Sequence, residues 1–161
     1  QADPLMPTVL SFGKINTDGG ATNIIPDQIH IQGTLRTFDE QWRYKAHKLL
    51  KTQAQLICQS MGGNCDFDIS VGYPFLQNDP ALTAKTKANM INYLGKDNVL
   101  ELPARMGGED FAFYSQQIPA CFYRLGVQNP NGTGLHTPNF DINEKALETG
   151  VGLMTWLAMH A

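Results

Sequence analysis

One histidine in a glycine-rich loop is the residue best placed to do chemistry. His136 stands in "GTGLHTPNFDINEKALETG", residues 132–150, just before Thr137-Pro138. A loop of this kind can present a ring nitrogen to a metal ion. The simpler interpretation is a surface histidine that is hydrogen-bonded to its own loop. Zinc takes three or four protein donors, so His136 alone makes no metal site.

An acidic pair forms the second candidate. Glu109 and Asp110 follow Gly107-Gly108, where the sequence predicts the start of a short helix. Helix capping is the default interpretation, because free N–H groups and the helix dipole favour negative charge at that end. Alternatively, one carboxylate orients a metal ligand or a water molecule. The sequence does not separate these alternatives.

Asn23 and Arg36 flank a predicted turn and strand. The two-residue period of a strand puts Arg36 on one face with Thr34, Gln32 and His30. A guanidinium group can hold a substrate carboxylate through two hydrogen bonds. Taken alone, Arg36 reads as a solvated or salt-bridged strand residue.

The remaining candidates carry weaker signals. His30, His47 and His160 have no carboxylate or second histidine three or four positions on, and we interpret them as structural. The sequence contains no HExxH, CxxC, GxSxG or GxxxxGK[ST] motif. Its three cysteines share no metal-ligand spacing, which favours reduced, mostly buried thiols. They are Cys58, Cys65 and Cys121.

In the N-terminal half, the sequence predicts strands and one long helix that would position these residues. Residues 8–15 and 29–36 read as two antiparallel strands. Asp39 then caps a long amphipathic helix that stops at Gly62-Gly63. Phe67, Ile69 and Val71 alternate with polar residues, which predicts a third strand.

The C-terminal half mixes helices with a buried strand. Asp79 and Pro80 open a helix that closes at Gly95. A short helix after Gly107-Gly108, a strand over 120–126 and a final helix from Asn143 follow. The order indicates an α/β (α+β) fold with a domain boundary at about residue 78. Neither half holds enough strands for its helices, so we expect both to be incomplete.

Composition bounds the function classes. The 161 residues are 42% hydrophobic and 17% charged, with a net charge of -3. This supports a packed core, and without a basic cluster it argues against a nucleic-acid partner. No apolar run approaches the roughly 20 residues that span a bilayer. The start "QADPLMPTVL" is expected to be an internal cut, and a cytoplasmic location is favoured with export left open.

Three motifs together resemble a known family. "NIIPDQIHIQGTLRTFD" at 23–39, "GGEDFAFY" at 107–114 and "LHTPNFDI" at 135–142 are similar to the aminoacylase/carboxypeptidase family of two-metal amidohydrolases. They resemble in particular its branch of N-acyl-amino-acid, hippurate and auxin-conjugate hydrolases. The resemblance implies a partial two-layer, ferredoxin-like dimerisation domain over residues 1–78. Residues 79–161 would be the C-terminal part of a zinc-peptidase-like catalytic domain.

The resemblance also implies roles for the candidate residues. His136 matches the last metal ligand of the family, whose other ligands and general base would lie before residue 1. Asn23 and Arg36 match a pair that acts across the dimer on the substrate's carboxylate and amide. Glu109 and Asp110 match a segment beside the metal centre, where a supporting role is expected.

The implied activity is amide-bond cleavage in N-acyl amino acids or similar small conjugates by metal-activated water. Two divalent ions, of zinc, manganese, cobalt or nickel, would serve each intact site in a homodimer. By itself the chain is expected to be inactive. The competing hypothesis is a non-catalytic dimerisation or binding module, in which His136 and Arg36 have no catalytic use.

Overall fold

The computed structural model describes residues 5–130 and 132–161, and it divides the chain into two compact units. The first comprises the described residues up to Leu76 together with Arg105–Asp110. The second comprises Gln77–Ala104 and Phe111–Ala161. The predicted domain of residues 1–78 begins with four residues that lie outside the described part. The segment 105–110 joins the first unit, although the predicted boundary assigns it to the second domain.

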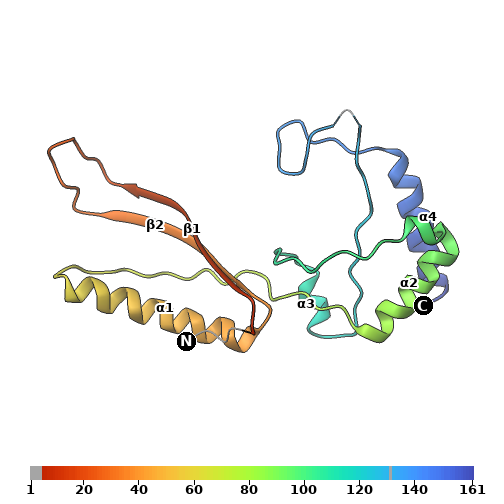
Figure 1. The fold of residues 1–161 in the computed structure, drawn as a ribbon, viewed down its shortest axis with the longest axis horizontal. Helices are drawn as coiled ribbons and strands as arrows, with labels where there is room; N and C mark the ends of the chain where they lie inside the picture. Colours follow the sequence, from red (N-terminus) through yellow and green to blue (C-terminus); the bar gives the residue numbers. More distant parts are fainter. Residues whose placement is uncertain (1–4, 131) are drawn as a thin grey trace. The chain divides into compact units, whose positions relative to one another are not determined.

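A two-stranded antiparallel hairpin begins the first unit, as predicted (Figure 1). It pairs β1 (Thr8–Thr17) with β2 (Ile29–Thr37). The register shifts between Phe12 and Lys14, so Gly13 is an extra residue in β1. Phe12 lies opposite Gly33, where a Cβ would stand 2.7 Å from the Phe12 ring. Glycine at position 33 therefore leaves room for that ring.

The long helix α1 (Glu40–Ser60) follows the hairpin, and its predicted limits are confirmed. The Asp39 carboxylate accepts a hydrogen bond from the Trp42 backbone N–H at 2.6 Å. At the other end Gly62 adopts φ +80°, which suits glycine because it has no side chain to clash. The Gly63 N–H then donates to the Cys58 carbonyl at 2.8 Å and reverses the chain.

Two predicted strands are absent, over 66–71 and 120–126. A strand exists only through hydrogen bonds to a neighbouring backbone. No described backbone pairs with 66–71. In the other segment the main-chain N–H and carbonyl of Phe122 bond to the Asn78 side chain, at 2.8 Å and 2.9 Å. The apolar residues of these segments predict an extended backbone. They do not predict whether a neighbouring strand is there to pair with it.

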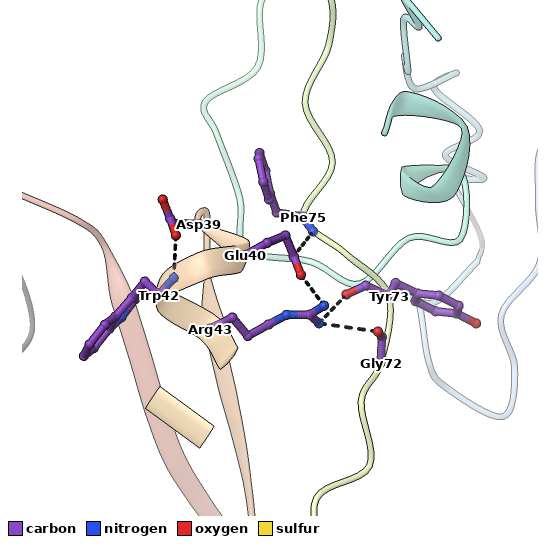
Figure 2. A network of polar contacts seen from close by, with 7 residues as sticks. All are labelled: Asp39, Glu40, Trp42, Arg43, Gly72, Tyr73 and Phe75. Carbon is purple, nitrogen blue, oxygen red and sulfur yellow. Dashed lines mark hydrogen bonds and ion pairs between the residues drawn. The ribbon is translucent and has the colours of Figure 1, made fainter. Parts of the chain in front are cut away.

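A buried arginine and its ion-pair partner connect the extended segment 72–75 to α1 through hydrogen bonds (Figure 2). Arg43 is 9% exposed and forms an ion pair with Glu40. It also donates to the carbonyl oxygens of Gly72, at 3.4 Å, and Tyr73, at 3.0 Å. Glu40 in turn accepts from the Phe75 N–H at 3.0 Å. Glu40 thus matches the charge of Arg43, and Nη1 is directed at two backbone carbonyls, while the buried Nε has no hydrogen-bond partner among the described residues.

The second unit packs α2 (Pro80–Leu94) against α4 (Lys145–Met159). The predicted cap of α2 is confirmed, since the Asp79 carboxylate accepts from the Leu82 N–H at 2.7 Å. Tyr93 of α2 stacks on Trp156 of α4, with ring centroids 5.7 Å apart. The short elements η1 (Lys96–Asn98) and α3 (Ala112–Ser115) complete this unit.

Few hydrophobic side chains are buried. Among the described residues the buried ones are Ala46, Met90, Ala112, Ala120 and Leu153. Many large apolar side chains are instead exposed, including Phe12 at 60% and Ile15 at 67% on β1. In the described part of the chain, no helix combines the length and apolar character needed to cross a membrane.

Candidate metal and substrate site

His136 lies in a loop that closes at its base. Gln128 and Ile142 form an isolated antiparallel bridge, and the Asn143 N–H donates to the Val127 carbonyl at 3.0 Å. Such a compact loop with neighbouring ends is the Ω-type often found at functional sites. These two contacts bring the ends of the loop together.

Hydrogen bonds within the loop fix the residues around His136. The Thr137 hydroxyl donates to the Gly134 carbonyl at 2.8 Å and also meets the Thr133 hydroxyl. The Phe140 N–H donates to the Thr137 carbonyl at 3.1 Å. These bonds form a tight turn on both sides of the histidine.

His136 has an unusual backbone conformation. With φ 63° it has the one positive φ among the described residues other than glycine. A left-handed conformation costs an ordinary residue about 1–2 kcal/mol, and such strain concentrates at functional sites. The side chain is exposed. The loop thus presents an imidazole to the surface at an energetic cost, where a glycine would fit without one.

The described residues do not complete a metal site. No group of three or more His, Cys, Asp or Glu side chains gathers anywhere in the described part of the chain. His136 offers a single nitrogen donor, while zinc takes three or four protein ligands. The described residues by themselves therefore do not make a complete metal site.

Arg36 is linked to the GGED segment within the first unit. Its guanidinium donates to the Met106 carbonyl at 2.9 Å. Gly108, two residues on, lies against Tyr73, whose ring is 3.6 Å from where a Cβ would stand. Arg36 is exposed on β2. The ion pairs among the described residues do not include it. The structure thus places Arg36 beside the residue that directly precedes the GGED segment.

The capping interpretation of the acidic pair is wrong. Helix α3 begins at Ala112, its N-cap is Phe111, and no side chain caps it. Glu109 is half-buried and Asp110 is exposed. Both belong to the first unit, whereas α3 belongs to the second. Phe111, which has no polar side chain, therefore occupies the N-cap position in place of either acidic residue.

Asn23 is far from Arg36. It lies in the turn that the Ala21–Ile24 bridge closes, between the two strands. Arg36 is seven residues beyond Ile29, the first residue of β2. A strand rises about 3.3 Å per residue, so Arg36 is about 20 Å or more from the hairpin turn. The two side chains do not meet within one chain.

An apolar hollow in the second unit corresponds to no motif of the sequence. Its lining includes Phe111, Phe122, Tyr123 and Met154. The Tyr123 hydroxyl donates to the Met154 sulfur at 2.6 Å. Burial, and then the nearby Cys121, raise the pKa of Tyr123. The consecutive apolar residues at 120–126 were the available signal, and they were interpreted as a strand.

The remaining histidines make local contacts. The Nε2 atom of His30 lies 2.9 Å from an Asp18 carboxylate oxygen. His47 meets Tyr44 edge to face, and His160 stacks on Trp156. None of these three contacts has the geometry of a ligand cluster.

Comparison with known proteins places this arrangement in a family. The chain is 35% identical over 169 residues to IAA-amino acid hydrolase ILR1-like 4 of Arabidopsis thaliana, covering 98% of the chain and 37% of the relative. It is 30% identical to N-acetyldiaminopimelate deacetylase of Enterococcus faecalis, covering 92% of the chain and 39% of the relative.

A solved structure agrees with these relatives. The YXEP protein of Bacillus subtilis, described as a dinuclear metal-binding peptidase of the M20 family, superposes with a TM-score of 0.73 at 29% identity. That match covers 94% of this chain and 41% of YXEP. The chain therefore spans about two fifths of the length of such relatives. The profile of peptidase family M20/M25/M40 matches residues 5–160, and this chain belongs to that hydrolase family.

Proposed function

We propose that these residues are the C-terminal part of a metal-dependent amidohydrolase that cleaves the amide bond of N-acyl amino acids or similar small conjugates. The observation that carries the proposal is His136, held in a strained conformation on a closed loop of an M20-family chain. The names of the relatives support this substrate class, since they include a hydrolase of an amino acid conjugate and a deacetylase.

His136 would supply one nitrogen ligand, and the remaining ligands would come from chain outside the described residues. A divalent ion held in this way polarises the amide carbonyl and activates water when it is bound. Zinc, manganese, cobalt and nickel all accept an imidazole donor, and two ions per site are proposed from the dinuclear neighbour. In the same proposal, residues 1–78 form an incomplete dimerisation domain and residues 79–161 belong to the catalytic domain. A cytoplasmic location is favoured, with export left open.

Arg36 would hold the substrate carboxylate. Its bond to the Met106 carbonyl uses one guanidinium nitrogen, so other donors of the fork remain for a ligand. A bidentate bond to a carboxylate is stronger than a bond to a neutral carbonyl. The half-buried Glu109 and the exposed Asp110 follow Met106 closely in sequence, and we give them a supporting role at the same site.

The separation of Asn23 from Arg36 supports a homodimer. No small substrate reaches across about 20 Å of hairpin to touch both side chains of one chain. If both act on a substrate, Arg36 serves one site and Asn23 serves the site of the second subunit. Exposed apolar side chains on the hairpin, such as Ile15 and Ile31, favour such an association.

Mixed dimers test this arrangement. Asn23→Ala and Arg36→Ala variants of the longer protein, each nearly inactive, are mixed under conditions that exchange subunits. One site of each mixed dimer then keeps both residues, so about a quarter of the wild-type activity returns. If both residues of one chain serve the same site, mixing restores nothing, because every site lacks one of them.

The central test removes the imidazole without straining the backbone. His136→Gly fits the left-handed conformation, so the loop keeps its shape. In the longer protein we expect loss of at least one metal ion per subunit by mass spectrometry, and loss of hippurate hydrolysis. His30→Gln, which changes an exposed histidine paired with Asp18, is the control and keeps both properties.

The same experiment separates the competing hypothesis. If the chain is a non-catalytic dimerisation or binding module, His136→Gly leaves metal content and activity unchanged. The 161-residue chain alone is expected to be inactive, because its described residues hold no cluster of metal ligands. Robust hydrolysis by this chain alone contradicts the proposal.

A further inference from the structure

An Asp-Gly bond lies in the turn of the β-hairpin (Figure 1). Asp18 and Gly19 stand between Thr17, where β1 ends, and Ile29, where β2 begins. No other aspartate of the sequence is followed by glycine. An aspartate in this position can isomerise, because glycine has no side chain to hinder the attack of its nitrogen on the aspartate side chain.

The structure leaves both reacting groups accessible. The Asp18 side chain is 64% exposed, and Gly19 is exposed as well. Apart from its neighbours in the chain, no heavy atom lies within 4 Å of the position where a Cβ of Gly19 would stand. The attacking atom would be the Gly19 nitrogen. Among the hydrogen bonds of residues 5–130 and 132–161, none is donated by this N–H group.

Other aspartates lack this combination. Asp79 is followed by Pro80, which has no N–H group, and its carboxylate accepts a helix N–H as the cap of α2. Asp97 is exposed, but the N–H of the next residue, Asn98, donates to the Gly95 carbonyl at 3.2 Å. The hairpin turn therefore presents a reactive pair that the helices do not.

We propose that Asp18 is a modification site at which the chain isomerises spontaneously to isoaspartate. The Gly19 nitrogen attacks the side-chain carbon Cγ of Asp18, and a C–N bond forms as a C–O bond breaks. The nitrogen-bound hydrogen and the carboxyl hydroxyl leave as one water molecule, which gives a cyclic succinimide. Water then adds to the main-chain carbonyl of this ring and breaks its bond to nitrogen. One water is released and one is taken up, so no oxidant or other reactant is required.

Isomerisation would change the hairpin turn. In isoaspartate the chain runs through the side-chain carbon, which adds one carbon to the backbone between β1 and β2. The carboxylate is then attached directly to Cα. In the unmodified turn this carboxylate lies 2.9 Å from the Nε2 atom of His30, a contact that depends on the full length of the side chain. The inference uses no residue of the candidate site and does not depend on the proposed hydrolase activity.

Ageing of the 161-residue chain tests the site. The chain is kept for several weeks in mildly acidic buffer, while circular dichroism checks that its helices persist, and it is then cleaved with trypsin. Lys14 and Arg36 bound the peptide that contains Asp18. The same peptide, aged separately in the same buffer, gives the rate without the fold.

Mass spectrometry distinguishes the products. Isoaspartate has the mass of the original peptide but separates by chromatography, and electron-transfer fragmentation locates it. The succinimide is lighter by one water. Deamidation of an asparagine in the same peptide would instead raise the mass, so it is not confused with either product.

We expect Asp18 in the folded chain to isomerise at a rate within about threefold of that in the free peptide, because local opening of an exposed turn costs little free energy. Asp27, in the same peptide but followed by glutamine, is the internal reference and stays unchanged. Asp18→Glu keeps the charge but cannot close the five-membered ring, so it removes both products. A rate in the folded chain below this range, or isomerisation at Asp27 rather than Asp18, overturns the proposal.

Discussion

At the scale of single residues, backbone conformation separates His136 from the other histidines. His30, His47 and His160 sit on regular strand or helix backbone, or next to it, and contact nearby side chains. His136 alone holds a left-handed conformation that favours glycine. Histidine enters this region more readily than most side chains, yet it still costs more than glycine there, which makes His136 a candidate for function.

Arg43 gives the residue-scale prediction. Arg43→Ala removes the partner of Glu40 and leaves the carbonyls of Gly72 and Tyr73 without their donor. Breaking a buried ion pair on one side costs about 3 kcal/mol, and we expect that loss in the free energy of unfolding from urea titrations followed by circular dichroism. Lys51→Ala, an exposed change on the same helix, shifts it by less than about 0.5 kcal/mol. Equal effects of the two changes would show that the Arg43 network adds no stability.

Among the helices and strands, α1 makes a pH-dependent contribution to the free energy of unfolding through His47. Burial, and then the neighbouring Arg43, lower the pKa of His47, while Glu40 partly opposes this. Between the ordinary histidine pKa of about 6.5 and the lower folded value, the unfolded chain binds more protons than the folded chain. The stability that depends on neutral His47 is therefore complete above about pH 6.5 and is lost as the pH falls through this window.

The measurement compares urea unfolding at several pH values in the wild type and in His47→Gln. The wild type is expected to lose stability as the pH falls below about 6.5, and the variant to lose less over the same interval. Parallel curves for the two proteins would assign the acid sensitivity to other groups.

The contact between α2 and α4 gives the second prediction at this scale. A methyl group at Gly152 would collide with the Tyr93 hydroxyl, and its ring carbon Cζ lies 3.1 Å from the Cβ position. Gly152→Ala gains about 1 kcal/mol of helix propensity, but overpacking costs about 1–3 kcal/mol. We therefore expect net destabilisation in thermal unfolding. In a Tyr93→Phe background the hydroxyl is gone and only the 3.1 Å approach of Cζ remains, so the same change is expected to destabilise the protein less; an equal cost in both backgrounds would exclude this clash.

At the scale of the whole molecule, exposed surface is large for the mass. A folded monomer of 17.8 kDa is expected to expose about 8,000 Å², and two independent halves about 9,600 Å². The chain exposes 12,838 Å². Much of the excess is apolar, as on the hairpin. Such a surface calls for cover by further chain or by a second subunit.

Binding of a hydrophobic dye tests whether the excess apolar surface is exposed in solution. The 161-residue chain is expected to bind a hydrophobic fluorescent dye strongly and to unfold with weak cooperativity, because few apolar side chains are buried. The longer protein of our proposal should bind several-fold less dye per chain, since its further residues would cover the same surface. A chain that remains monomeric, binds no dye and unfolds in one sharp transition would contradict the expectation that its surface needs a partner.

The sequence determined the elements whose signals are local. Asp39 and Asp79 cap the helices that they were predicted to cap, because the cap and the N–H group that it accepts from are three residues apart. The hairpin follows from alternation over two adjacent segments. The motif resemblance likewise identified the family to which the chain belongs.

Tertiary structure decided what depends on residues distant in the chain. Residues 66–71 alternate like a strand but have no neighbouring backbone, and pairing is what makes a strand. The link from Arg36 to Met106 spans seventy positions. The burial of Arg43 and the left-handed conformation of His136 are set by contacts and turns that residue type does not encode. Local chemistry fixes where an element begins, but only packing fixes what it meets.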